Sequence, residues 1–263
     1  MRIVVKVGTS TLTHSTGNLN IRRVEELCKV LSDLKNAGNE IILVSSGAIG
    51  MGIGKLSISE RPDDIPTKQA AAAVGQCELM YTYDRLFSEY NHTVAQILLT
   101  GDDVKSEERH LNFKNTIYRL LELGALPIIN ENDSIVTDEI VIGDNDTLGS
   151  IVATSVRADL LVILTDINGL YTSDPRHDKG AELLSVVSEI TDDILNFGGD
   201  SRTCLGTGGM KTKLYAAKIA TDAGVEVIIT NGKNPGVLYN IVDGSDFLGT
   251  RFCAAKTPGG ESV

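Results

Sequence analysis

The chain has 263 residues, of which 42% are hydrophobic, so it can bury a sizeable core as one large domain or two closely packed halves. Its formal net charge of −11 and the lack of a basic stripe argue against a nucleic-acid partner. No apolar run reaches the roughly 18 residues that span a membrane, and the short first strand pattern is not a signal peptide. Cys28, Cys77, Cys204 and Cys253 are far apart without a CxxC pair, which favours free core thiols in a reducing cytoplasm.

Short apolar runs alternate with helical patterns along the chain. We expect strands at 3–7, 40–44, 94–99, 126–130, 160–165 and 225–230. We expect helices at 21–38, 68–90, 109–124, 145–159 and 210–223. Because the strands are apolar on both faces and alternate with helices, they predict a doubly wound α/β fold around a parallel sheet. With neither an internal repeat nor a low-complexity linker, residues 1–255 are expected to form a single domain and 256–263 a tail.

Polar and glycine residues gather where the expected strands end. The segments are "KVGTS" (6–10), "SSGAIGMG" (45–52), "TGDD" (100–103), "NENDS" (130–134), "TD" (165–166) and "TNG" (230–232). In open α/β sheets, ligands bind at the carboxyl ends of the strands. The clustering therefore predicts a binding edge, although a single polar strand end would be ordinary turn chemistry.

Lys6 lies near the buried end of the first strand. It is either an edge-strand lysine that extends to solvent or an ammonium group aimed at a phosphate, with Gly8 letting the ligand approach the backbone. In the segment 45–52, the backbone N–H groups suit a second anion and the Ser46 hydroxyl suits a carboxylate. A tight turn between strand and helix would also explain some of these glycines.

The segment "GTGGMKTK" (206–213) resembles a Walker A loop but departs from it in two ways. Met210 separates Gly209 from Lys211, and no apolar strand precedes the segment. It is therefore expected to be a glycine-rich helix N-terminus, which binds anions through free N–H groups and the helix dipole. The alternative is a plain flexible loop.

Carboxylates and amides dominate the segments 130–134 and 143–147. Such side chains hold an ammonium group, orient lysines or coordinate Mg²⁺, although Asp144 and Asn145 equally suit a helix N-cap. Two lysines, glycine-loop amides and an aspartate between the lysines would suffice for phosphoryl transfer, which depends mainly on positioning and electrostatics. A carboxylate acceptor is already ionised and needs no general base.

The segments "VVKVGTSTLT", "SSGAIGMG", "INEND", "IGDNDTLGS" and "GTGGMKTK" together resemble the amino acid kinase family. The resemblance covers nearly all of the chain and implies the carbamate kinase-like fold, an open, mainly parallel β-sheet sandwiched by helices. In that fold the N-terminal half binds the acceptor and the C-terminal half binds the nucleotide. The resemblance is nearest to members that use ATP and Mg²⁺ to phosphorylate the γ-carboxylate of L-glutamate, the first step of L-proline biosynthesis.

The resemblance also implies roles for individual residues. Lys6 and Lys213 would stabilise the transferred phosphoryl group and Asp146 would organise them. Ser46, Asp133 and Asn145 would hold glutamate. ATP would be bound by Lys6, Thr165, Asp166, Thr207, Gly208, Gly209, Met210, Lys211, Thr212 and Lys213, with no protein ligand assigned to the metal. Within that segment Lys213 is expected to be catalytic, and Lys211 to be solvated.

Further expectations follow from the same resemblance. They are feedback inhibition by L-proline, a homo-oligomer (dimer or tetramer), and a chain that ends near the end of the kinase domain, without the PUA domain of many members. The alternatives are a kinase of the same fold for another carboxylate or for carbamate, and a non-catalytic nucleotide or amino acid sensor. A dinucleotide-dependent oxidoreductase is disfavoured, because "SSGAIGMG" lacks the G-x-G-x-x-G register.

Overall fold

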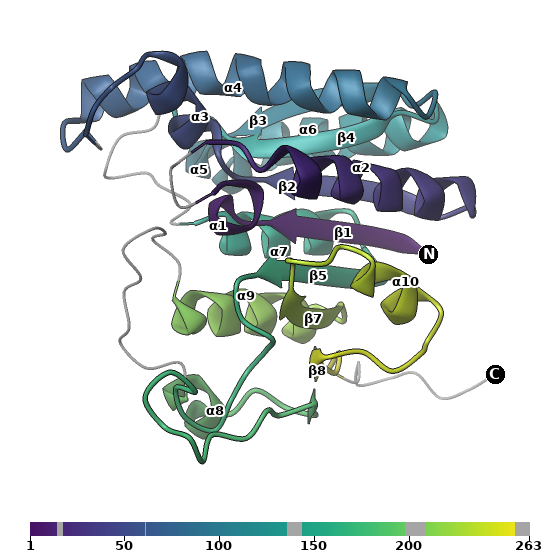
Figure 1. Cartoon of the computed structure of the whole chain (residues 1–263). Helices are drawn as coiled ribbons and strands as arrows, with labels where there is room; N and C mark the ends of the chain where they lie inside the picture. Colours follow the sequence, from purple (N-terminus) through teal and green to yellow (C-terminus); the bar gives the residue numbers. More distant parts are fainter. Residues whose placement is uncertain (15–17, 61, 136–143, 198–208, 256–263) are drawn as a thin grey trace.

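The computed structural model describes residues 1–14, 18–60, 62–135, 144–197 and 209–255. Within these residues, eight strands form one sheet in the order β3-β4-β2-β1-β5-β7-β8-β6 (Figure 1). Their bounds are β1 Arg2–Val7, β2 Glu40–Ser45, β3 Val94–Leu99, β4 Leu126–Glu131, β5 Leu160–Thr165, β6 Val186–Val187, β7 Glu226–Asn231 and β8 Gly249–Phe252. The pairings from β3 across to β7 are all parallel, as the buried strand patterns predict.

Helices cover both faces of this sheet. Their bounds are α1 Thr9–Leu12, α2 Ile21–Asn36, α3 Ala48–Lys55, α4 Ile65–Ser88, α5 Gly101–Lys105, α6 Glu107–Glu122, α7 Asn145–Ser155, α8 Asp192–Asn196, α9 Met210–Asp222 and α10 Val237–Val242. Helices α2, α4 and α10 contribute to one hydrophobic core, and α6, α7 and α9 to the other. The predicted α/β fold with an open, mainly parallel sheet between helices is confirmed.

The central strand β1 separates the two cores by ordinary strand alternation. Ile3, Val5 and Val7 pack on the side of α2 and α4, whereas Val4 packs on the side of α7 and α9. Lys6 is two residues beyond Val4 and therefore shares its side of the sheet. The pairing of β1 with both β2 and β5 rules out the edge-strand alternative for Lys6.

The close crossing of α3 and α4 depends on two glycines. A Cβ atom at Gly52 would lie 1.8 Å from the Ala71 carbonyl oxygen, and one at Gly75 would lie 1.7 Å from that of Ala48. Any other residue would push the helices apart. The turn before α3 contains Gly47 at φ 109°, a left-handed conformation that favours glycine. Together these glycines fix the position of Ser46 and of the α4 side chains behind it.

The structure also contains elements that the sequence patterns do not predict. Strand β8 runs antiparallel to β7 at one side of the sheet, and the two-residue strand β6 pairs with β8. Both strands are too short to show a periodic pattern. No helix among the described residues is long and apolar enough to cross a membrane.

The cysteine expectation is only partly correct. Cys28, Cys77 and Cys253 are free thiols, and Cys204 lies outside the described residues. Cys28 is buried in the core, but Cys77 is exposed on α4, so the expectation of a core thiol is wrong at that position. Its place on the helix turns the side chain away from the apolar face that contains Leu79 and Tyr83.

Candidate active site

Two buried lysines converge on one buried aspartate at the carboxyl edge of the sheet. The Lys6 Nζ lies 2.5 Å from one Asp146 carboxylate oxygen, and the Lys213 Nζ lies 3.0 Å from the other. Asp146 is 1% exposed and each lysine is 6% exposed. The lysines come from β1 and α9, which are more than 200 residues apart in the chain, and Asp146 from α7 lies between them. This arrangement confirms that the three predicted residues are close together.

The start of helix α7 sets the position of Asp146. The Asp144 carboxylate accepts hydrogen bonds from the backbone N–H groups of Asp146 and Thr147, at 2.7 and 2.8 Å, and so caps the helix. The N-cap interpretation is therefore correct for Asp144. Behind it, a Cβ at Gly149 would lie 3.3 Å from the Lys6 Cβ, so the glycine gives the lysine stem room to pass along α7.

The electrostatics of the site keep Asp146 ionised. Burial alone would raise its pKa, but the ammonium groups of Lys6 and Lys213 outweigh burial and hold the pKa below its usual value. The neighbouring Asp144 differs, because burial and then the charge of Asp146 raise its pKa. The result is a fixed carboxylate that holds two ammonium groups apart, with one positive charge in excess. Such a cluster is suited to an incoming anion.

A hydrogen-bonded chain of side chains lies next to these charges. The Asn145 amide donates to the Ser46 hydroxyl at 2.7 Å and to the Asn130 side-chain oxygen at 2.9 Å. The Asn130 amide in turn donates to the Gln76 side-chain oxygen at 2.9 Å. Asn130 and Gln76 are buried. Two of the predicted acceptor residues, Ser46 and Asn145, are thus in direct contact.

The third predicted acceptor residue, Asp133, lines a hollow of about 330 Å³ between α3, α4, β3 and the end of β4. Gln76 and Glu131 line the same hollow, which therefore connects the amide chain to Asp133. Burial raises the pKa of Asp133 to about 6. A partly desolvated carboxylate of this kind is suited to pair with the ammonium group of an amino acid.

The described residues of the predicted nucleotide segments lie at the end of β5 and at the start of α9. The Thr165 hydroxyl donates to the Asp166 carboxylate at 3.1 Å, and Asp166 is exposed. Gly209 is the N-cap of α9, and the Thr212 hydroxyl donates to its carbonyl at 2.9 Å. Met210 and Lys211 follow in the first turn, with Lys211 exposed and Lys213 buried. Thr207 and Gly208 lie outside the described residues.

The structure adds polar residues to which the sequence patterns assign no role. Gln76 and Asn130 support Asn145, and Asn231 donates to the Asp166 carbonyl at 3.4 Å and to the Asn168 side chain at 2.9 Å. Asn130 and Asn231 lie in polar strand ends, and the clustering of polar residues at strand ends is the feature of the sequence that indicates them. Gln76 lies within a helix, where nothing in the sequence distinguishes it from a surface glutamine.

Among the described residues, no group of three or more His, Cys, Asp or Glu side chains is placed to hold a metal ion. Asp146 is already paired with two ammonium groups. A magnesium ion held mainly by nucleotide phosphate oxygens, as is common beside ATP, would be compatible with these residues.

Comparisons with known proteins identify a family and close relatives of the chain. The model of the amino acid kinase family matches residues 1–231. A glutamate 5-kinase of Clostridium perfringens is 52% identical over 259 residues, covering 97% of this chain and 96% of the relative. A glutamate 5-kinase of Clostridium tetani is 54% identical over 254 residues, covering 97% and 95%.

Two solved structures share the fold. The carbamate kinase from Giardia lamblia bound to AMP-PNP has a TM-score of 0.68 and covers 97% of this chain and 98% of its own. An isopentenyl phosphate kinase has a TM-score of 0.66 and covers 96% and 100%. Each is 16% identical in sequence, so these two likenesses concern the fold alone.

Proposed function

This chain belongs to the amino acid kinase family, and we propose that it transfers the γ-phosphoryl group of ATP to the γ-carboxylate of L-glutamate. The product is L-glutamyl 5-phosphate, and the reaction is the first step of L-proline biosynthesis. The observation that carries the proposal is the buried Lys6–Asp146–Lys213 cluster. The acceptor is supported by relatives that are about half identical over nearly the whole chain and are themselves glutamate 5-kinases.

The reaction needs charge stabilisation more than proton transfer. An oxygen of the glutamate γ-carboxylate forms a bond to the γ-phosphorus of ATP. The bond from that phosphorus to the bridging oxygen breaks, and ADP leaves with the electron pair. Negative charge spreads over the transferred group, where the Lys6 and Lys213 ammonium groups stabilise it. No proton moves in this step, so it needs no general base.

The two halves of the chain divide the substrates between them. Ser46, Asp133 and Asn145 hold glutamate, with the Asp133 carboxylate facing the α-ammonium group. Thr165, Asp166 and the segment from Thr207 to Lys213 bind ATP, and Lys6 serves both. Magnesium bound to the phosphates supplies further charge neutralisation. Asp146 keeps both lysines in place throughout, because its carboxylate has one oxygen for each ammonium group.

Four further properties belong to the same proposal. Residues 1–255 act as one domain with the tail 256–263, and the chain acts in the cytoplasm, in keeping with the free thiols of Cys28, Cys77 and Cys253. It assembles as a homo-oligomer, which light scattering on a sizing column would test. L-proline inhibits it, and an initial rate that does not change at high proline concentration would contradict this.

The experiment that tests the function mixes the purified chain with ATP, Mg²⁺ and hydroxylamine, which converts an acyl phosphate into a coloured hydroxamate. The acceptors compared are L-glutamate, N-acetylglutamate, L-aspartate and none. The proposal predicts colour with L-glutamate only. Colour with another acceptor would keep the mechanism and replace the substrate. No colour from folded protein that binds ATP would contradict catalysis and favour a sensor.

A further inference from the structure

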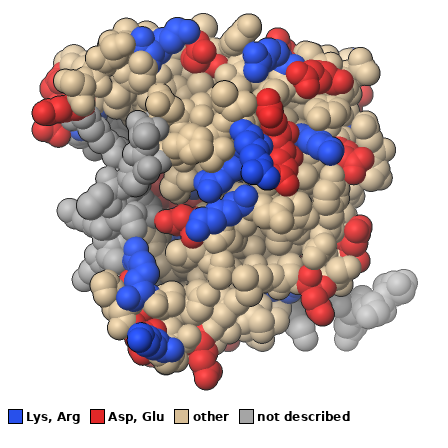
Figure 2. Space-filling model, viewed as in Figure 1, with Lys and Arg blue, Asp and Glu red and all other residues tan. Residues whose placement is uncertain are grey.

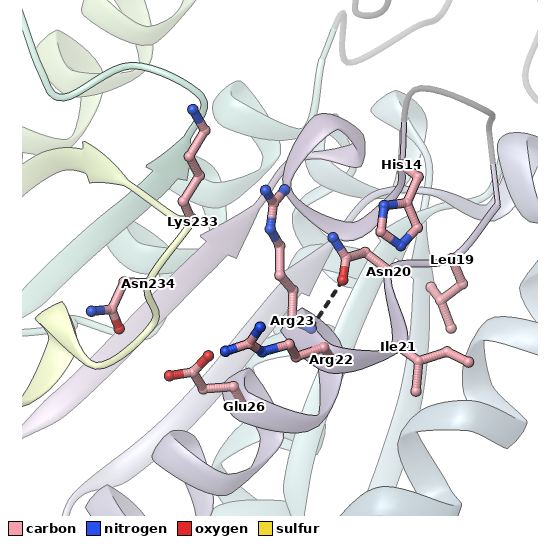
Figure 3. A pocket seen from close by; sticks show the side chains of 9 residues that line it. All are labelled: His14, Leu19, Asn20, Ile21, Arg22, Arg23, Glu26, Lys233 and Asn234. Atoms are coloured by element: carbon pink, nitrogen blue, oxygen red, sulfur yellow. Dashed lines mark hydrogen bonds between the residues drawn. The ribbon is translucent and has the colours of Figure 1, made fainter.

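A second hollow lies away from the site described above, between the start of α2 and the turn after β7 (Figure 3). It has a volume of about 660 Å³. His14, Asn20, Arg22 and Arg23 form one wall, and Lys233 and Asn234 form the other. In Figure 3 the Arg23 and Lys233 side chains extend from different segments toward the same side of the hollow. Cationic groups that are far apart in the sequence are thus brought together here.

This hollow is separate from the proposed catalytic cluster. Helix α2 packs on the face of the sheet that contains Ile3 and Val5, and α10, just beyond Lys233, packs on the same face. Lys6 lies on the other side of β1, against α7, where a Cβ at Gly149 would touch its stem. The sheet itself therefore lies between the hollow and the cluster of Lys6, Asp146 and Lys213.

The cations at this hollow lack the carboxylate partners that seven other described surface cations of the chain have. Arg2, Lys55, Arg109, Arg119, Arg176, Lys218 and Arg251 each form an ion pair with an aspartate or glutamate. No carboxylate among the described residues lies within ion-pair distance of Arg22, Arg23 or Lys233. Among the described residues, the Arg23 guanidinium hydrogen-bonds to the Thr11 carbonyl alone, at 3.5 Å.

The charge around the hollow also contrasts with the rest of the protein. Glu26 is the one acidic residue among the described residues of its lining, against Arg22, Arg23 and Lys233. The whole chain has 35 acidic and 24 basic residues, so an excess of cations at one place is unusual for it. Figure 2 shows Lys and Arg atoms near the centre of the face that α2 crosses, with Asp and Glu atoms beside them. Three cations in one hollow repel each other, and a bound anion would relieve that repulsion.

We propose that this hollow is a binding site for a phosphate group, carried either by inorganic phosphate or by a small phosphate monoester. Arginine guanidinium groups bind phosphate oxygens in a forked, two-point geometry, and lysine adds a point charge. The Asn20 and Asn234 side chains provide amide groups at the rim. The positive end of the 16-residue helix α2 adds to the attraction but does not define the site.

The test must measure phosphate binding at the hollow itself, because the catalytic cluster also attracts phosphate. The protein is labelled with nitrogen-15 and saturated with Mg²⁺ and a non-hydrolysable ATP analogue. Inorganic phosphate, and in a second arm glycerol 3-phosphate, is then added at constant ionic strength. The backbone amide signals of Arg22, Arg23 and Lys233 are followed by NMR. The proposal predicts saturable shifts at all three residues, and the arm with the lower dissociation constant identifies the source of the phosphate group.

Two variants decide the outcome. Arg23→Gln and Lys233→Gln should each raise the dissociation constant by about tenfold, since each removes a charge-assisted hydrogen bond. Lys29→Gln is the matched control, because Lys29 is exposed on the same helix and does not line the hollow. Shifts that rise linearly without saturation, or that are equally weakened by Lys29→Gln, would show a merely solvated cationic surface and overturn the proposal.

Discussion

Replacing Lys213 with methionine separates the catalytic role of this lysine from its role in the fold. Methionine keeps the length and apolar stem of the buried side chain and removes only the ammonium group. Asp146 keeps its ion pair with Lys6 at 2.5 Å, so no buried carboxylate is left without a partner. The cluster then goes from one excess positive charge to none. We therefore expect the variant to fold normally and to lose stabilisation of the transferred phosphoryl group.

The size of the effect follows from the position of Lys213. Loss of one such charge-stabilising group lowers kcat by about 10²–10³-fold, or roughly 2.7–4 kcal/mol. In contrast, Asp146→Asn would leave two buried ammonium groups without a counter-charge and should lower the free energy of unfolding by about 3–5 kcal/mol. The first variant is thus predicted to lose rate and keep stability, and the second to lose both.

The assay measures ADP release at saturating ATP and glutamate, together with urea unfolding of each variant. Lys218→Met is the matched control, because Lys218 is half-buried on the same helix, outside the cluster, and pairs with Asp222 at 3.2 Å. Its rate should equal that of the wild type. A folded Lys213→Met protein with kcat within about threefold of the wild type, less than ~1 kcal/mol of barrier, would refute the assigned role.

Three other outcomes test the acceptor side of the site. Because burial raises the pKa of Asp133 to about 6, its carboxylate is ionised above that pH and neutral below it. The KM for glutamate should therefore rise as the pH falls from 7 to 5.5. The KM of Asp133→Asn should not change with pH over this range. Gln76→Leu removes the acceptor of the buried Asn130 amide, at a cost of about 1–3 kcal/mol, and should raise the KM for glutamate more than it lowers kcat. Gln76→Glu keeps an acceptor oxygen there, so its KM should lie between those of Gln76→Leu and the wild type. Equal changes in KM in both variants would disprove the role of Gln76 in positioning Asn130. Gly75→Ala should lower the free energy of unfolding by at least about 1–3 kcal/mol in urea denaturation, since its Cβ would lie 1.7 Å from the Ala48 carbonyl oxygen. The control is Ala70→Ser, at an exposed position of the same helix. A free-energy change as small as that of the control would contradict the tight crossing of α3 and α4.

The sequence predicts the architecture well wherever a long pattern is present. The six expected strands and five expected helices occur in the structure with boundaries shifted by a few residues. Their apolar runs and periodicity reflect burial on both faces of one sheet, which is a property of the local sequence. Strand β8 escapes prediction because its four residues show no period, and its place is set by antiparallel pairing with β7.

The candidate site is partly predictable for the same reason. Parallel strands bring their carboxyl ends to one edge, so Lys6, Ser46 and Asp133 could be grouped without knowing any distance. The approach of Lys213 to Asp146 requires α7 and α9 to pack together, and only the resemblance to a family indicated it. Gln76 could not be found, because its role depends on the crossing of α3 and α4 and on its contact with Asn130.

The most direct test of the account is to identify the bond that forms. L-glutamate labelled with carbon-13 at the γ-carboxyl carbon is mixed with ATP, Mg²⁺ and the protein, and the carbon spectrum is recorded by NMR during turnover. The account predicts that the labelled carbon signal shifts and splits through coupling to phosphorus as ADP appears. ADP formation without coupling at that carbon, or coupling at a carbon-13-labelled α-carboxyl group instead, would contradict transfer to the γ-carboxylate.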